Sequence, residues 1–586
     1  MKRTIKKSRL VLLVTLLFIP LFSFSQGNYI RLVDTEGDTA RIQGLKLRYS
    51  GSTQPGSRLR INDTLIKVYS SGAFAAFLEY KPGLNRVDLV SENPKYGTAT
   101  KTIWVECKVP LPEKTTTDFA IDYVQLIPDQ DQCLVTGDVV NVKVKAQPGN
   151  IVRVAGIRLF ELPDSVTGGI SGIYQGQYRI ASTDTFMLAG VKAEMTNSDG
   201  AEKSATSKSL LSINSRDFNR YARTTGKMPA MYMGLGTDRL GGAKFGYLDT
   251  AVVVKITGRT GDMDRIQLAD GVTGWINKAN IALLPEGYIV PTPILSSSFM
   301  ISGKDDFDYV RMYIPERVPY TSNLEINPSR IELDIYGVTS NTNWITQLTS
   351  AKEVKNVYYR QLSHDVLRVI IELNHKQAWG YSVYYENRYL IVKVRHQPEK
   401  LKLSNLTVAL DAGHGGSSDG AWGSTGLLEK NVNLQIVMKL KKALEKKGAK
   451  VILTRSDDSE IYTIDRWISL VPQNPDILLS IHNNSIGNSD PLAMKGTSTY
   501  YKYIGFRPLS ACMYKELLKC GLSENGNTGS FNFALNSPTE FVNALLEVAF
   551  MSNPEDEMKL MDDRFLDRIA DHVIAGLEEF LREARK

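Results

Sequence analysis

Four short motifs in the last third of this 586-residue sequence contain the His, Glu and Asp side chains that metal-dependent hydrolysis uses. They are residues 411–416 (DAGHGG), Glu429-Lys430, residues 480–484 (SIHNN) and residues 547–554 (EVAFMSNP). Three of them border short apolar runs typical of buried strands, and Glu429 comes just before a helical pattern. Because the carboxyl ends of parallel strands meet at one edge of an α/β sheet, we expect the four motifs to converge there.

Two imidazoles and two carboxylates at such an edge suit a zinc ion. Catalytic zinc takes three protein ligands and keeps a fourth position open for water, which leaves one carboxylate as a base. Of the six histidines, only His414 and His482 lie in loops of this kind. The other four lack that setting and are interpreted as surface or packing residues: His364, His375, His396 and His572.

Each motif residue also has a structural interpretation. A single histidine after a strand is more often structural than a metal ligand, and Glu429 fits a helix cap. Glu547 is harder to explain in this way, because a carboxylate in an apolar strand is costly unless it is paired or protonated. The functional interpretation therefore depends on the four motifs together.

Strands and helices alternate around these motifs, which predicts an α/β domain with a largely parallel sheet over residues 404–586. Strands are expected at residues 407–410, 450–454, 477–481, 497–501 and 543–548. Helices are expected at residues 431–447, 463–471, 508–522 and 564–584.

These motifs resemble the zinc-dependent N-acetylmuramoyl-L-alanine amidases that open with Asp-x-Gly-His-Gly-Gly, over residues 406–581. The resemblance implies that His414, Glu429 and His482 bind one zinc ion and that Glu547 is the catalytic acid/base. It implies hydrolysis of the amide between N-acetylmuramic acid and the L-alanine of the stem peptide, in cell-wall remodelling or daughter-cell separation. Peptidoglycan is the implied substrate. The resemblance leaves open whether a division-site or activator protein is a further partner.

The sequence also departs from this family. Arg455 and Arg466 stand where the family usually has Arg, but residues 534–536 read Ala-Leu-Asn where an Arg often precedes the catalytic Glu strand. Some relatives insert a helix that blocks the zinc after the second His motif. Only residues 484–496 separate His482 from the next strand here, so we expect no autoinhibition of that kind.

Two other functions fit the same residues. A zinc peptidase that cuts stem-peptide bonds would need the same ligands, and only its products would differ. A non-catalytic peptidoglycan-binding scaffold would suit the long upstream region, but a degenerate relative would be expected to have lost a ligand or the base.

The pattern of the upstream region predicts all-β modules. The expected fold is therefore multi-domain, with Ig-like sandwiches and a small barrel followed by the C-terminal α/β zinc hydrolase domain. Alternating strands and Gly/Pro/Asn turns predict Ig-like β-sandwiches at residues 27–113 and 117–215. Residues 240–286 resemble a bacterial Src-homology-3-like barrel. Residues 294–398 are similar to AMIN modules, with another β module as the alternative.

The first 25 residues have a basic start, an apolar run and small residues before position 26, which predicts a secretory signal peptide. An exported protein, in the periplasm of a Gram-negative bacterium, is therefore expected. Five of the basic residues lie in this segment, so the net charge of +7 falls to +2 after its removal. That charge argues against nucleic-acid binding, and no later stretch is apolar enough to span a membrane.

Overall fold

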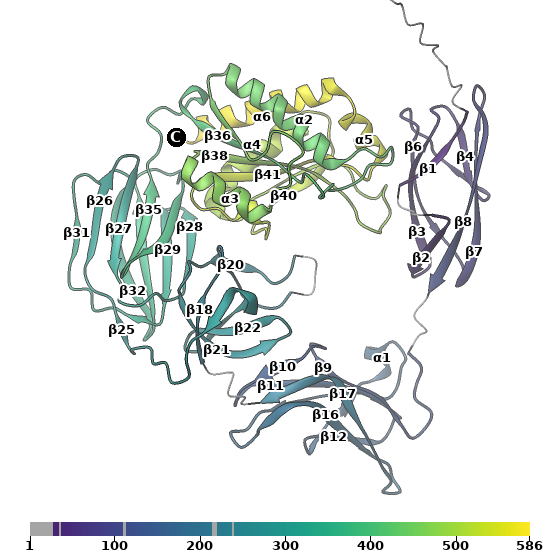
Figure 1. Ribbon diagram of the computed structural model, residues 1–586, viewed down its shortest axis with the longest axis horizontal. Coiled ribbons are helices and arrows are strands. Elements are labelled where there is room, and N and C mark those ends of the chain that lie inside the picture. The colour runs from purple at the N-terminus through teal and green to yellow at the C-terminus, as the bar shows by residue number, and fades with distance from the viewer. Residues whose placement is uncertain (1–26, 34–36, 109–112, 214–219, 237–239, 586) are drawn as a thin grey trace, which may run out of the picture.

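The computed structural model describes residues 27–33, 37–108, 113–213, 220–236 and 240–585. The signal peptide expected at residues 1–25 lies outside these described residues. Figure 1 shows β-rich modules arranged around a C-terminal α/β domain. Within the described ranges, no helix has the length and apolar character needed to cross a membrane.

The first module is a sandwich of two sheets around one core. One sheet has the order β1 (Ile30–Leu32), β3 (Lys46–Thr53), β6 (Ala73–Glu79). The other has the order β2 (Thr39–Gln43), β8 (Gly97–Lys108), β7 (Gly83–Asn93), β4 (Arg58–Ile61), β5 (Thr64–Ile66). Val87 and Leu89 of β7 alternate with less buried residues and pack against Tyr49 and Phe74.

The second module also has two sheets. The first consists of β14 (Phe160–Glu161), β15 (Ile173–Arg179), β11 (Val139–Ala146) and β9 (Ile121–Ile127). The second consists of β13 (Ile157–Arg158), β12 (Ile151–Val154), β16 (Phe186–Thr196), β17 (Glu202–Ile213) and β10 (Gln132–Leu134), and a short helix α1 (Asp164–Thr167) follows β14.

The next module is a small, strongly bent sheet. Its strands are β18 (Arg220–Thr224), β19 (Ala230–Tyr232), β20 (Lys244–Tyr247), β21 (Val253–Thr260), β22 (Met263–Ala269), β23 (Val272–Asn277) and β24 (Ile281–Leu283). β10 pairs with β21, so backbone hydrogen bonds join this barrel module to the second sandwich. The sequence predicts a barrel that begins at residue 240, whereas β18 and β19 already pair with its strands.

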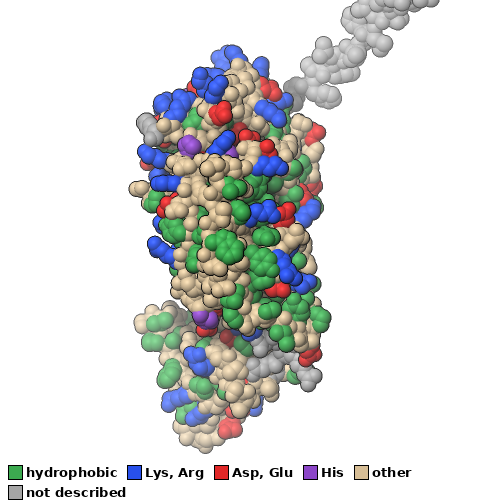
Figure 2. Space-filling view, turned by 90° about the vertical axis from the view of Figure 1, so that its left-hand side faces the viewer, with side chains coloured by type: hydrophobic (Ala, Val, Ile, Leu, Met, Phe, Trp, Pro, Cys, Tyr) green, Lys and Arg blue, Asp and Glu red, His purple; other side chains and the backbone are tan. Residues whose placement is uncertain are grey.

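The third β-sandwich spans most of residues 294–398. One sheet has the order β31 (Ile345–Gln347), β26 (Phe299–Lys304), β27 (Phe307–Tyr313), β35 (Tyr389–Arg395), β34 (Tyr381–Glu386). The other has β28 (Tyr320–Ile326), β29 (Ser329–Tyr336), β33 (Val366–Leu373), β32 (Val354–Ser363), and β25 (Ile294–Leu295) pairs with β30 (Val338–Thr339). Figure 2 shows the side of the molecule where this module lies, with hydrophobic side chains among charges of both signs.

The C-terminal domain has one six-stranded sheet. Its order is β37 (Lys450–Leu453), β36 (Thr407–Ala412), β38 (Ile477–Asn484), β41 (Val542–Phe550), β39 (Thr497–Tyr500), β40 (Glu524–Thr528). The first four strands are parallel, and β39 runs antiparallel to β41. The predicted α/β architecture is therefore confirmed.

Helices cover both faces of this sheet because side chains alternate along its strands. Val408 and Leu410 of β36 belong to the core shared with α2 (Glu429–Lys446), α4 (Arg507–Leu518) and α6 (Asp563–Glu583). Ala409 and Leu478 face the opposite way, against α3 (Thr463–Leu470). The sequence analysis missed β40 and the short helix α5 (Pro554–Leu560).

The barrel, the third sandwich and the α/β domain meet around Glu540. The indole Nε1 of Trp467 donates to the Glu540 carboxylate at 3.2 Å, and the Tyr247 ring packs edge-to-face on Trp467 with a centroid distance of 5.1 Å. The backbone N–H of Tyr381 donates to the carbonyl of Thr539 at 2.6 Å. Burial in this junction raises the pKa of Glu540 to about 7.

We predict that Glu540→Gln stabilises the protein in a pH-dependent way. The pKa of this carboxyl group is higher in the folded than in the unfolded state. The group therefore destabilises the folded protein increasingly as the pH rises from about 4.5 through 7. The substitution should raise the free energy of unfolding by about 3 kcal/mol at pH 8 and change it little at pH 4.5. Urea unfolding at both pH values measures this, with the exposed Glu578→Gln as control. Equal effects of Glu540→Gln at the two pH values would contradict the prediction.

Candidate metal centre and active site

The carboxyl ends of β36, β38 and β41 bring the expected motifs to one edge of the sheet. β36 ends at Ala412, two residues before His414. β38 carries His482, and its parallel register with β41 makes His482 and Glu547 direct neighbours. Glu429 is the first residue of α2, so this helix begins two residues earlier than predicted.

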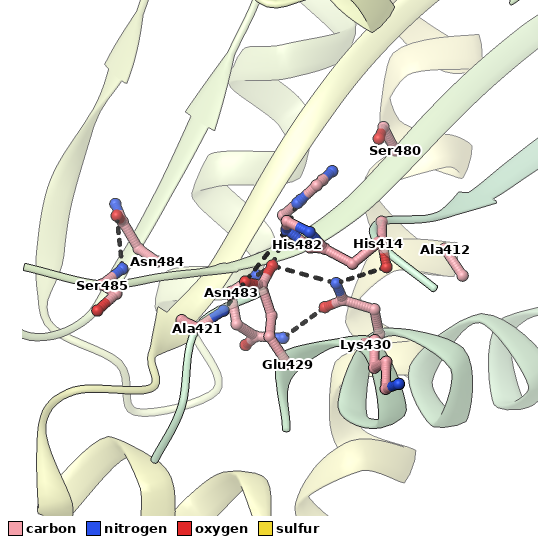
Figure 3. Close-up of polar contacts among 12 residues, drawn as sticks. Ala412, His414, Ala421, Glu429, Lys430, Ser480, His482, Asn483, Asn484 and Ser485 are labelled. Carbon is pink, nitrogen blue, oxygen red and sulfur yellow. Dashed lines mark hydrogen bonds and ion pairs between the residues drawn. The ribbon is translucent and has the colours of Figure 1, made fainter. Parts of the chain in front are cut away.

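His414, Glu429 and His482 form a compact trio (Figure 3). The His414 Nε2 atom lies 3.3 Å from Glu429 Oε2, and the His482 Nδ1 atom lies 3.2 Å from Glu429 Oε1. Tetrahedral zinc with bonds of ~2.0–2.1 Å separates its ligand atoms by roughly 3.3 Å. The three side chains therefore fit the ligand set of a zinc ion in both chemistry and spacing.

Glycines make room for these side chains. A Cβ atom at Gly413 would lie 2.2 Å from the His482 imidazole, and one at Gly420 would lie 2.5 Å from the Glu429 carboxylate. Gly420 also has a φ of +72°, which favours glycine. His414 itself adopts a φ of +64° between Gly413 and Gly415, a conformation that is uncommon for residues other than glycine.

The Glu429 carboxylate is held on several sides. The backbone N–H groups of Ala421 and Asn483 donate to it at 2.8 Å and 3.1 Å, and the Asn433 side-chain amide donates at 3.1 Å. Burial alone would raise the pKa of Glu429, but the hydrogen bonds and charges of His414 and His482 lower it well below its usual range. An ionised carboxylate is the form that a metal ion binds.

The pKa of His482 is shifted in the opposite direction. Burial would lower the pKa of this imidazole, but the hydrogen bond and charge of Glu429, and the charges of Glu547 and Asp411, raise it to about 9. The metal-free imidazole therefore holds a proton at neutral pH, and a metal ion must displace that proton to bind.

A buried ion pair anchors the His414 loop beneath the trio. Arg466 donates to the carboxylate of Asp411 at 2.9 Å and to the carbonyl groups of Ala412 and His414, both at 2.6 Å. Burial would raise the pKa of Asp411, but the charge of Arg466 and hydroxyl hydrogen bonds lower it below its usual value. Arg455 also donates to the Ala412 carbonyl and to two further backbone carbonyls around the loop. Both arginines noted in the sequence therefore shape the site without entering it.

Glu547 is only 7% exposed and lies on β41, where every residue is buried. It lines a cleft of about 570 Å³ together with the three trio residues. This volume is typical of small-molecule and substrate sites. The loop of residues 485–496, which follows β38, contains no helix, and its Ser485 lines the cleft.

All four remaining histidines lie within ion-pair distance of acidic side chains outside this cleft: His364 with Asp365, His375 with Glu353, His396 with Asp308, and His572 with Glu516. Sequence reasoning missed the supporting roles of Asn433 and Asn483. Asn433 follows Glu429 by four residues, and that helical spacing was an available signal for a shared face.

The C-terminal part of the chain is similar to a known family of proteins. Residues 408–579 match the family model of N-acetylmuramoyl-L-alanine amidase. The C-terminal region carries a domain of this family. The resemblance inferred from the four motifs is therefore confirmed, and the upstream β modules lie outside the match.

Several relatives are similar to the amidase domain. A probable cell wall amidase of Staphylococcus aureus, LytH, is 32% identical over 182 residues. The matched region is 31% of this chain and 60% of that relative, so the chain spans about 60% of the length of the curated relatives it matches. The solved catalytic domain of CwlV, an N-acetylmuramoyl-L-alanine amidase from Bacillus (Paenibacillus) polymyxa var. colistinus, is 33% identical. The match covers 30% of this chain and 98% of that domain, with a TM-score of 0.29.

We predict that Gly413→Ala weakens zinc binding. The added methyl group overlaps the His482 imidazole and must displace it, which should lower zinc affinity by about 10- to 100-fold. Competition with a chromogenic chelator measures the affinity. Gly487→Ala is the control, because a Cβ atom there meets nothing within 4 Å. Unchanged zinc affinity in Gly413→Ala would contradict the ligand role of His482.

Proposed function

We propose that this protein hydrolyses, with zinc bound, the amide between N-acetylmuramic acid and the L-alanine of the peptidoglycan stem peptide. One observation carries the proposal: an amidase domain has Glu547 in the same cleft as a trio of zinc-type ligands. That arrangement supplies both components that amide hydrolysis requires, an electrophilic site and a proton carrier.

His414, Glu429 and His482 would hold the zinc ion, which when bound polarises the scissile carbonyl and favours ionisation of water. Glu547 would take a proton from the attacking water and pass it to the leaving nitrogen. Such acid/base catalysis is worth about 100- to 10,000-fold. The Asp411–Arg466 pair would act indirectly, by fixing the loop that carries His414.

The setting of this activity is also a proposal. The expected signal peptide and the cell wall amidase among the relatives support an exported enzyme that acts on peptidoglycan. The periplasm of a Gram-negative cell is the compartment that we propose for it. The β modules would place the domain on the wall or at a division-site partner, in remodelling or daughter-cell separation. The open loop of residues 485–496 supports an enzyme that needs no activator to uncover its zinc site.

Glu547→Gln separates catalysis from metal binding. We expect the variant to retain one zinc ion per chain and to lose at least about 100-fold in release of peptides from purified peptidoglycan, because the amide cannot carry the proton. Zinc content is measured by elemental analysis, and peptide release by chromatography.

His414→Ala is the matched comparison, and it should lose both zinc and activity. Full zinc stoichiometry in His414→Ala, or full activity in Glu547→Gln, would contradict the assigned roles.

A further inference from the structure

The barrel module reaches into the cleft of the amidase domain. Lys244, the first residue of β20, and Leu240, which lies just before this strand, line the cleft together with Glu547. The backbone N–H of Lys244 donates to the Asn532 side chain at 3.0 Å, and the Asn532 amide donates to the Gly242 carbonyl at 2.9 Å. These bonds hold Lys244 at the cleft, although it lies 288 residues before Asn532.

The charge of Lys244 has no role in the metal site. Apart from the trio and Glu547, Lys244 is the charged side chain among the described residues that line the cleft. Its Nζ atom makes one long hydrogen bond, of 3.4 Å, to the Asn532 carbonyl. No carboxylate of the described chain lies within ion-pair distance of this amine.

A second lysine lies nearby on the amidase domain. Lys502 donates to the Ser537 hydroxyl at 3.4 Å, and burial together with the charge of Lys244 lowers its pKa to about 8. Burial also lowers the pKa of Lys244. Two partly buried ammonium groups that repel each other are stabilised when an anion binds beside them.

We propose that Lys244 forms a subsite for a carboxylate on the peptide part of the substrate. This inference rests on the proposed function, since stem peptides carry carboxylates whereas the N-acetylated sugars beside the scissile amide are neutral. The barrel module would then contribute a specificity-determining side chain to the amidase domain, in addition to any role in localisation.

Binding to the Glu547→Gln protein tests the proposal without turnover. The ligands are N-acetylmuramoyl-L-alanyl-D-glutamate with both carboxylates free and its neutral diamide, and calorimetry gives both Kd values on the zinc-loaded full-length chain. We expect the diacid to bind at least tenfold tighter than the diamide. Adding Lys244→Gln should remove most of that preference and leave diamide binding unchanged, whereas Lys244→Arg should retain it.

Lys227→Gln is the matched control, because Lys227 pairs with Asp465 across the same module boundary without lining the cleft. It should leave the preference unchanged. A diacid preference that survives Lys244→Gln would overturn the proposal. Equal weakening of both ligands would also overturn it, since Lys244 would then only hold the barrel in place. Because the readout is binding, a wild-type protein that releases no stem peptides from purified peptidoglycan would refute the proposed function, while this test would still decide the subsite.

Discussion

Two imidazoles share one buried carboxylate at the edge of the sheet, and much of the amidase domain serves to keep them there. Glu429 is 3% exposed, and an ionised group so buried needs compensating partners on every side. Backbone N–H groups of Ala421 and Asn483, the Asn433 amide and the two histidines supply them. The same contacts hold the three potential ligand atoms in place. The entropic cost of ordering these side chains is therefore met when the protein folds and not when a metal ion binds.

The parallel register of β38 and β41 places Glu547, the proposed proton carrier, beside the trio. Since His482 and Glu547 are paired across these strands, a shift of one residue would turn one of them to the opposite face of the sheet. Both strands are almost wholly buried, which fixes that register. The proposed metal site and the proposed acid/base thus depend on one packing arrangement. The barrel module contributes to the same cleft from outside the domain.

Much of this arrangement can be predicted from the sequence. Long apolar strands and amphipathic helices identify the α/β domain, and motif spacing brings His414, Glu429, His482 and Glu547 together. Helix α5 was missed although Asn553 caps it and Pro554 begins it, a signal that was present. No signal in the sequence predicts that Lys244 lies at the cleft, because its contact with Asn532 depends on how the folded modules pack together.

The central claim is that the Glu429 site and Glu547 hydrolyse the bond between sugar and peptide. Mass spectrometry of the products released from purified peptidoglycan by residues 26–586, with and without a chelator, tests it most directly. The account predicts free stem peptides that begin at L-alanine, lost on chelation and restored by zinc. Shortened stems still joined to sugar, or release that is insensitive to chelation, would contradict it.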